Sequence, residues 1–305
     1  PDEVGGLALE EAHPGKLVES AALAAVEAPD VTYRPTIPRP LIDKGELSAA
    51  QLEAVVYAGE AHQHMLATGE RKGFLIGDGP GVGKGRTLAA IILDNWKQGR
   101  KKAVWISETQ NLVNSAVRDW TAMGQKESDI FGLNKYTRDQ PIDRADGVLY
   151  TTYTTMASGL ETMSGGGLKA KQAKGAPVGE LVKTRLDQTV AWLGKDFDGV
   201  IIFDEAHNMQ NSLEREGERG DVSAAAKALA SVTLQQLLPK ARIVYSSATA
   251  ATRVDALAFA DRLGLWGEGP PFPTKGDFIQ SIEASGLGAM EIVAQNMKAM
   301  GAYMS

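Results

Sequence analysis

The sequence predicts an α/β fold in which a mainly parallel sheet is flanked by helices. Short apolar runs alternate with helical patterns along the chain, and each run is apolar at consecutive positions, as in strands that are covered on both faces. The expected strands are residues 73–77, 102–107, 147–153, 199–206 and 242–248.

The expected helices lie between these strands. One further helix precedes the first strand, within the segment LSAAQLEAVVYAGEAHQHMLATG, where Ser48 is the expected cap and Gly69 the expected stop. The others are residues 84–96, 111–123, 182–194 and 224–238.

The bulk composition sets limits on the class of protein. The 305 residues, 43% of them hydrophobic, can bury a core of their own. The absence of cysteine excludes disulfides and thiolate metal sites. No stretch is long and apolar enough for a membrane span, and no signal peptide pattern opens the chain, so we expect no membrane partner and a cytoplasmic protein, or a nuclear one in a eukaryote. The net charge of −6 leaves room for a local basic strip.

The stretch FLIGDGPGVGKGRT, residues 74–87, is typical of a phosphate-binding loop between a strand and a helix. Such a loop directs backbone N–H groups at one point, where the helix N-terminus adds positive charge. Three alternating glycines before a lysine argue against a turn without a ligand. Lys84 is expected to reach the β and γ phosphates of a bound nucleotide. The expected nucleotide-binding residues are Gly79, Pro80, Gly81, Val82, Gly83, Lys84, Gly85, Arg86 and Thr87.

Two residues of this loop depart from the usual pattern of Gly, four residues, Gly-Lys, then Ser or Thr. Asp78 stands first, and Gly85 follows the lysine without the hydroxyl that usually holds magnesium. Thr87 cannot substitute, because two further helical residues rotate a side chain by about 200°. Mg²⁺ is therefore expected on the acidic motif, phosphate oxygens and water, while Arg86 and Thr87 face the α phosphate or the sheet.

An acidic motif ends the apolar run VIIFDEAH. Asp204 and Glu205 would emerge at the carboxyl edge of the sheet, where ligands of such folds bind. Asp204 is expected to hold Mg²⁺, directly or through water, and Glu205 to orient and deprotonate the attacking water. Alone, this pair could be a solvated strand end. Together with Lys84 it predicts the catalytic set of a nucleotide hydrolase.

Taken together, these motifs resemble the first motor domain of superfamily 2 helicases, in which GVGKG, DEAH and SAT occur in this order. The segments GDGPGVGKGRT, FDGVIIFDEAH, RLGLWGEGPPF and GAMEIVAQNMKAMGAYMS are similar to the strawberry notch family of helicase-like ATPases, with a bacterial or phage-type member favoured. The resemblance extends from Arg34 to the chain end. It implies a RecA-like P-loop NTPase, and it makes Asp78 and Gly85 the family's own form of the loop.

The resemblance also implies roles for residues outside the loop. Gln51 matches the glutamine that reads adenine in related motors, the alternative being an exposed helix residue. His207, Ser247 and Thr249 match the motifs that couple the nucleotide site to a second surface. Matches to segments that face nucleic acid are Ser107, Asn111, Thr151, Thr152 and Tyr153.

The domain organisation follows from the same resemblance. Residues 1–40 are expected to form an extension, 41–265 a RecA-like ATP-binding domain with a flexible insertion near 160–180, and 266–305 a segment leading toward a second RecA-like domain. The expected partners are that domain of the same parent chain, which would carry an arginine finger, and nucleic acid, with DNA favoured over RNA. Without the second domain the chain is expected to hydrolyse ATP slowly. An ATP-binding scaffold in transcription or chromatin control is the alternative function.

Other patterns favour plain interpretations. His62 and His64, two apart on a helix, do not share a face, which indicates core or surface histidines rather than metal ligands. The lysine-rich runs 97–102 and 169–174 are typical of solvated faces. The tetrad TKGD at 274–277 matches a guanine-reading motif, but PPFP precedes it where a strand is required, so we interpret it as chance.

Overall fold

The computed structural model describes residues 3–4, 7–8, 21–77, 83–162, 168–172, 175, 177, 182–207, 224–249 and 254–304. Of the predicted nucleotide-binding residues, Gly79, Pro80, Gly81 and Val82 lie outside this part of the chain.

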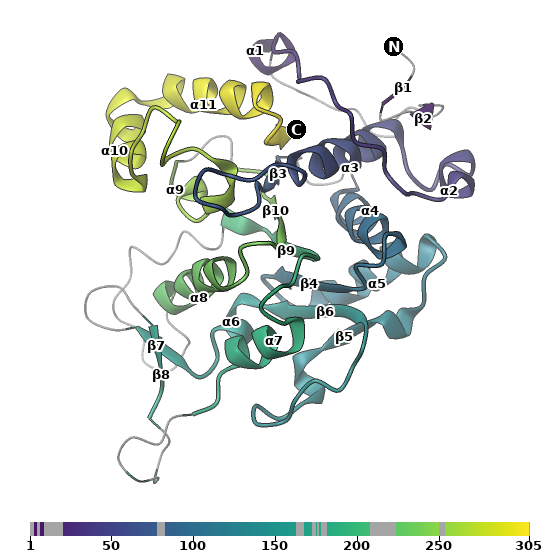
Figure 1. Ribbon diagram of the computed structural model, residues 1–305, viewed down its shortest axis with the longest axis vertical. Helices are drawn as coiled ribbons and strands as arrows, with labels where there is room; N and C mark the ends of the chain where they lie inside the picture. Colours follow the sequence, from purple (N-terminus) through teal and green to yellow (C-terminus); the bar gives the residue numbers. More distant parts are fainter. Residues whose placement is uncertain are drawn as a thin grey trace.

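A seven-stranded sheet forms the centre of the described chain, with the strand order β11-β3-β10-β9-β4-β6-β5 (Figure 1). Every neighbouring pair in it is parallel, which confirms the predicted parallel sheet. Its strands are β3 (Phe74–Ile76), β4 (Lys102–Ser107), β5 (Ile130–Gly132), β6 (Gly147–Thr152), β9 (Val200–Asp204), β10 (Arg242–Ser246) and β11 (Tyr303–Met304). Two antiparallel pairs stand apart from it, β1 (Glu3–Val4) with β2 (Leu7–Ala8) and β7 (Leu160–Thr162) with β8 (Leu168–Ala170).

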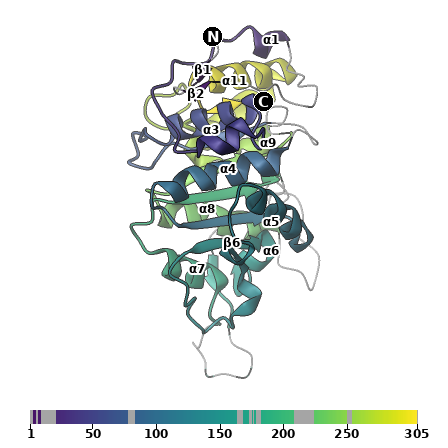
Figure 2. The same ribbon diagram turned by 90° about the vertical axis from the view of Figure 1, so that its right-hand side faces the viewer.

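Helices cover both faces of the sheet, so the molecule has three layers. On one face, α3, α4 and α5 bury alternate strand residues such as Trp105 and Ile202; Figure 2 shows α4 lying over the sheet on this side. On the other face, α6 to α11 bury the residues between them, such as Ile106 and Phe203. The helices are α1 (Ala21–Ala24), α2 (Arg39–Asp43), α3 (Ala49–Ala61), α4 (Lys84–Lys97), α5 (Val113–Ala122), α6 (Tyr153–Met156), α7 (Arg185–Leu193), α8 (Ala224–Leu237), α9 (Val254–Leu257), α10 (Lys275–Ser285) and α11 (Leu287–Ala299). Because consecutive strand residues point to opposite faces, both covered, the strands read as continuous apolar runs.

The start of α3 is as predicted, but its end is not. Ser48 caps the helix by accepting a hydrogen bond from the Gln51 backbone, and the Gln51 side chain accepts one from Ser48 N in return. The predicted stop at Gly69 is wrong, because the helix ends at Ala61. His62 then turns its ring into the core, and Gly69, with φ 86°, belongs to the separate tight turn that follows.

The two histidines after α3 occupy the core and the surface, as expected. His62 is buried, and its Nε2 lies 3.0 Å from the Ile243 carbonyl oxygen. His64 is exposed and contacts Glu60. Within the described ranges, no group of three or more His, Cys, Asp or Glu side chains is arranged to hold a metal ion.

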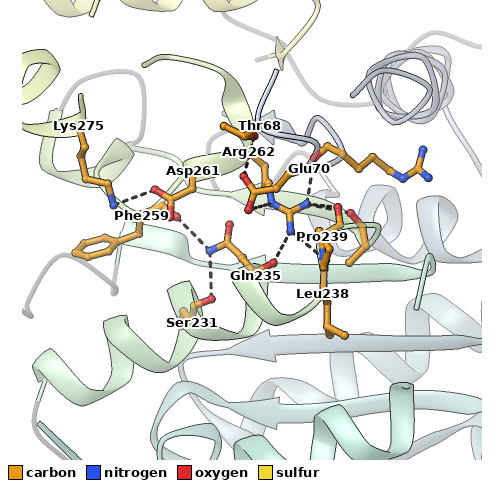
Figure 3. A network of polar contacts seen from close by, with 12 residues as sticks. Thr68, Glu70, Ser231, Gln235, Leu238, Pro239, Phe259, Asp261, Arg262 and Lys275 are labelled. Carbon is orange, nitrogen blue, oxygen red and sulfur yellow. Dashed lines mark hydrogen bonds and ion pairs between the residues drawn. The ribbon is translucent and has the colours of Figure 1, made fainter. Parts of the chain in front are cut away.

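A buried arginine fixes the end of α8. The Arg262 side chain is fully buried, and its guanidinium donates to the carbonyls of Gln235 at 2.5 Å, Leu238 at 3.0 Å and Pro239 at 3.1 Å (Figure 3). The last carbonyls of a helix lack partners within the helix and carry partial negative charge, so a cation stabilises them. The Nε atom of Arg262 also lies 3.6 Å from Glu70 Oε1. Arg262 thereby ties α8 to the loop that leads into β3.

The strand β11, Tyr303–Met304, lies at one edge of this sheet beside β3. Leu75 N donates to the Ala302 carbonyl at 2.8 Å, and Gly77 N donates to the Met304 carbonyl at 2.7 Å. A Cβ atom at Gly77 would lie 2.5 Å from the Tyr303 ring, so glycine is needed for this close packing. The strand before the phosphate-binding loop is therefore supported by residues more than two hundred positions later in the sequence. The predicted division of the chain near residue 265 stays a prediction.

Candidate nucleotide-binding site

Lys84, Asp204 and Glu205 meet at the carboxyl edge of the sheet. Lys84 is the first residue of α4, while Asp204 ends β9 and Glu205 follows it. The Lys84 ammonium donates to Glu205 Oε1 at 2.7 Å and lies 3.8 Å from Asp204 Oδ1. Both contacts are largely shielded from solvent, because the Lys84 side chain is only 14% exposed. The three predicted catalytic residues thus form one cluster beside the predicted loop.

Asp204 is held from several sides. The Trp105 indole donates to its Oδ2 at 3.4 Å, and the Glu205 backbone N–H donates to its Oδ1 at 3.0 Å. Burial raises the pKa of Asp204, whereas the Lys84 ammonium opposes that rise. A carboxylate in such a position depends on a nearby cation to stay ionised.

Glu205 adopts an unusual backbone conformation. Among the described residues other than glycine, it has the one positive φ, 51°. Side chains rarely adopt this left-handed region, and residues held there often belong to functional sites. The turn places the Glu205 carboxylate between Lys84 and His207, whose Nδ1 lies 3.3 Å from Oε2.

A polar chain runs from Glu205 to the next strand end. His207 Nδ1 also lies 3.2 Å from Ser247 Oγ, which in turn lies 3.4 Å from Thr249 Oγ1. Of the residues predicted to act in coupling, His207 contacts the candidate catalytic carboxylate directly, and Ser247 and Thr249 are linked to it through His207. Their role in coupling stays a prediction.

Gln51 contacts the phosphate-binding loop directly. Its Nε2 donates to the Gly83 carbonyl at 3.2 Å, while its Oε1 accepts from Ser48 N at 3.0 Å. Gly83 has φ 74°, and a Cβ atom there would lie 2.4 Å from Gln51 Nε2. Both ends of the amide are thus engaged, one with the start of α3 and the other with Gly83. The adenine-reading role of Gln51 stays a prediction.

The residues after Lys84 face acidic side chains and the core. A Cβ atom at Gly85 would lie 2.5 Å from Asp119 Oδ2. Arg86 pairs with Glu46, Nη1 to Oε2 at 3.1 Å, and its Nε lies 3.5 Å from Asp119 Oδ1. Thr87 is buried. Glu46 and Asp119 were not anticipated, because neither belongs to a recognisable motif.

Most of the residues predicted to face nucleic acid lie inside the molecule. The side chains of Ser107, Thr151, Thr152 and Tyr153 are buried, and the Tyr153 hydroxyl donates to the Asp204 carbonyl at 2.9 Å. Asn111 is exposed at the carboxyl edge. In this conformation a polymer could reach Asn111 and not the buried four, whose predicted contact with nucleic acid remains untested.

The donor set at this edge fits Mg²⁺ bound together with a nucleotide. Hard cations prefer carboxylate, phosphate and water oxygens. Asp204 offers such an oxygen beside Lys84, the residue expected to bind phosphate. Gly85 offers no hydroxyl, so phosphate and water oxygens would complete the coordination of the metal.

A parallel sheet with a glycine-rich lysine loop after one strand and Asp-Glu at the end of another defines a P-loop NTPase. The chain belongs to the family described as P-loop containing NTP hydrolase pore-1, whose model matches residues 12–305.

Its relatives include strawberry notch proteins from several organisms. It is 44% identical to strawberry notch homolog 1 of Gallus gallus over 298 residues, and 42% identical to the Caenorhabditis elegans homolog over 299. It is 38% identical to FORGETTER 1 of Arabidopsis thaliana over 296 residues. Each match covers 96% of this chain but only 15% to 22% of the relative.

Among solved structures, the chain is similar to the Sulfolobus solfataricus SWI2/SNF2 ATPase core in complex with dsDNA. The TM-score is 0.46 at 12% identity, over 76% of this chain and 40% of that one. In the described part of the chain, no helix has the length and apolar character needed to cross a membrane.

Proposed function

We propose that this chain is the ATP-binding half of a nucleic-acid-dependent, helicase-like ATPase, in which hydrolysis drives movement on, or remodelling of, DNA or RNA. The observation that carries the proposal is the cluster of Lys84, Asp204 and Glu205, with Lys84 Nζ 2.7 Å from Glu205 Oε1. A binding module needs a lysine for phosphate, but a carboxylate held at the reacting end of the nucleotide is needed only for hydrolysis.

Each residue has a distinct task in this proposal. Lys84 binds the β and γ phosphates, and Asp204 holds Mg²⁺, which supplies charge neutralisation at the phosphate oxygens. Glu205 orients a water molecule and accepts its proton. Because Lys84 contacts Glu205, its transfer to phosphate oxygens would leave that carboxylate available as the base.

The polar chain through His207 supports coupling to a second domain. It joins Glu205 to Ser247 and Thr249 on the neighbouring strand end, so a displacement there would change the surroundings of the base. A second RecA-like domain of the parent chain would act on this surface. Such a domain would also supply the arginine that stabilises transition-state charge.

The test is ATP hydrolysis by the native protein that contains this chain, without polymer and with single-stranded DNA, duplex DNA or RNA. Glu205→Gln should keep ATP binding and lose turnover, whereas Lys84→Ala should lose binding. Stimulation of ATP hydrolysis by one polymer supports the proposal and identifies the nucleic acid on which the protein acts. Turnover that never exceeds the Glu205→Gln blank would instead favour a nucleotide-binding scaffold.

A further inference from the structure

A cavity lies at the amino edge of the sheet, opposite the candidate nucleotide-binding site. Its volume is about 400 Å³, and it is bounded by the ends of α3 and α4, the start of β10 and the extended segment 32–34. The cavity is lined by three arginines and three amide side chains, with no Asp or Glu in the lining: Arg34, Arg100, Arg242, Gln63, Asn95 and Gln98.

The three guanidinium groups have few anionic partners. Arg100 donates to neutral groups, from Nε to Asn95 Oδ1 at 2.7 Å and from Nη2 to Gln98 Oε1 at 2.5 Å. Arg34 is exposed and has no hydrogen bond or ion pair within the described part of the chain. Arg242 lies 3.4 Å from Asp198, a side chain that is itself half exposed. The cavity therefore concentrates positive charge.

Two nearby pKa values are lowered by burial and, to a smaller extent, by these like charges. Burial, with the neighbouring Arg100 and Arg71, lowers the pKa of Arg242 to about 10. Burial and the same arginines lower the pKa of His62, in the cavity wall, to about 3. An anion in the cavity would relieve the repulsion among these groups.

The wall formed by the extended segment is firmly built. Glu60 Oε2 accepts from Thr32 N at 2.8 Å and from Tyr33 N at 2.7 Å, and Asp94 accepts from the Tyr33 hydroxyl. These nearby carboxylates are thus engaged in holding the segment. The Tyr33 ring packs so closely on Gly59 that a Cβ atom there would overlap it.

We propose that this cavity binds a phosphate-class anion, namely the diphosphate or phosphomonoester group of a small molecule. Guanidinium forks match the oxygens of phosphate in both geometry and charge. The Gln98 amide N–H groups already donate to the Tyr33 hydroxyl and to Asp94, so the arginines are the main donors for the anion. The concave shape favours a terminal group over a continuous nucleic-acid backbone. This site is separate from the candidate nucleotide site, which lies at the other end of the parallel strands, and it does not depend on the proposed function.

The test uses the 305-residue chain carrying Lys84→Ala, so that the phosphate-binding loop does not contribute. Sodium pyrophosphate is titrated calorimetrically in buffer free of phosphate. Saturable binding is expected, and Arg34→Gln, Arg100→Gln and Arg242→Gln should each raise Kd at least about tenfold, as for loss of a charge-assisted hydrogen bond. The matched control is Lys97→Gln, an exposed residue of the same basic run outside the cavity, which should leave Kd within about twofold.

An NMR titration locates the bound anion. The chain has four histidines, and the ring signals of His62 can be assigned with His62→Gln. Pyrophosphate should shift the His62 signals and leave those of His207, at the nucleotide site, unchanged. Absence of saturable binding, or binding that survives all three arginine changes, would overturn the proposal. So would DNA oligonucleotide binding that the arginine variants abolish while pyrophosphate does not bind, since that would assign the cavity to a polymer backbone.

Discussion

His62 should make the stability of the fold depend on pH in a defined range. The side chain is buried, and its Nε2–H donates to the Ile243 carbonyl, while Nδ1 has no hydrogen-bond partner in the described chain. Protonation would place an unpaired N–H and a charge beside Arg71, Arg100 and Arg242. Burial and these charges lower the pKa of His62 from its ordinary 6.5 to about 3.

The sign of the effect follows from proton binding. Between about pH 6.5 and 3 the unfolded chain carries a proton on His62 that the folded chain lacks, so the free energy of unfolding falls as the pH falls. The slope from this residue is about 1.4 kcal/mol per pH unit, and the full loss between the two pKa values is about 5 kcal/mol. Above pH 6.5 His62 is neutral in both the folded and the unfolded chain, so its contribution to the free energy of unfolding no longer changes with pH.

The assay is urea unfolding of the unsubstituted 305-residue chain and of its His62→Gln variant at pH values from 8 to 4.5, in buffer free of phosphate. Glutamine can still donate to the Ile243 carbonyl but cannot titrate, so the difference between the two proteins isolates the histidine from the carboxylates. The free energy of unfolding of the unsubstituted chain, relative to that of His62→Gln, should fall by about 3 kcal/mol over the two pH units below 6.5. A constant difference across this range, or an NMR pKa for His62 near 6.5, would refute the reasoning.

Three further substitutions test contacts around the sheet. Arg262→Met should lower the free energy of unfolding by about 3 kcal/mol or more, because it leaves the α8 carbonyls without their donor; urea unfolding with unchanged stability would contradict this. Gly77→Ala should cost about 1–3 kcal/mol through its clash with Tyr303, and adding Tyr303→Leu should recover part of that loss in thermal unfolding. Gly85→Ser should weaken ATP binding about tenfold or more by displacing Asp119, and Asp119→Ala should restore it; tighter binding by Gly85→Ser alone would show that the missing hydroxyl limits affinity.

The central strands could be predicted because burial on both faces requires a run of consecutive apolar residues. In β4 and β9, neighbouring residues such as Trp105 and Ile106 face different helical layers, and both must be apolar. The edge strands β5 and β11 are too short to show such a run. They have three and two residues, and the pairing of β11 with β3 joins distant parts of the chain. Short edge strands are therefore found only once the sheet is assembled.

The residues of the candidate site also fall into those that could be predicted from sequence and those that could not. Lys84, Asp204 and Glu205 could be placed together from sequence, because each follows or ends a predicted strand and parallel strands end at one edge. Burial of Ser107, Thr151 and Tyr153 could not be predicted, since it depends on which face of the sheet each side chain meets and what covers it. The arginines of the amino-edge cavity come from three separate segments, one of them the extended stretch before α3, and only the fold brings them together.

The unusual glycine after Lys84 has a physical explanation in the packing of α4 on α5. In most such loops this position carries a hydroxyl that binds magnesium, and the absence of this hydroxyl alone would suggest a degenerate loop. Here a Cβ atom would lie 2.5 Å from Asp119 Oδ2, and the same carboxylate is 3.5 Å from Arg86 Nε. Glycine is therefore the residue that lets an acidic side chain from α5 approach the first turn of α4, where the helix N-terminus favours negative charge. The sequence departure and the buried Asp119 are two parts of one arrangement, so a larger residue at position 85 should be tolerated only when Asp119 changes with it.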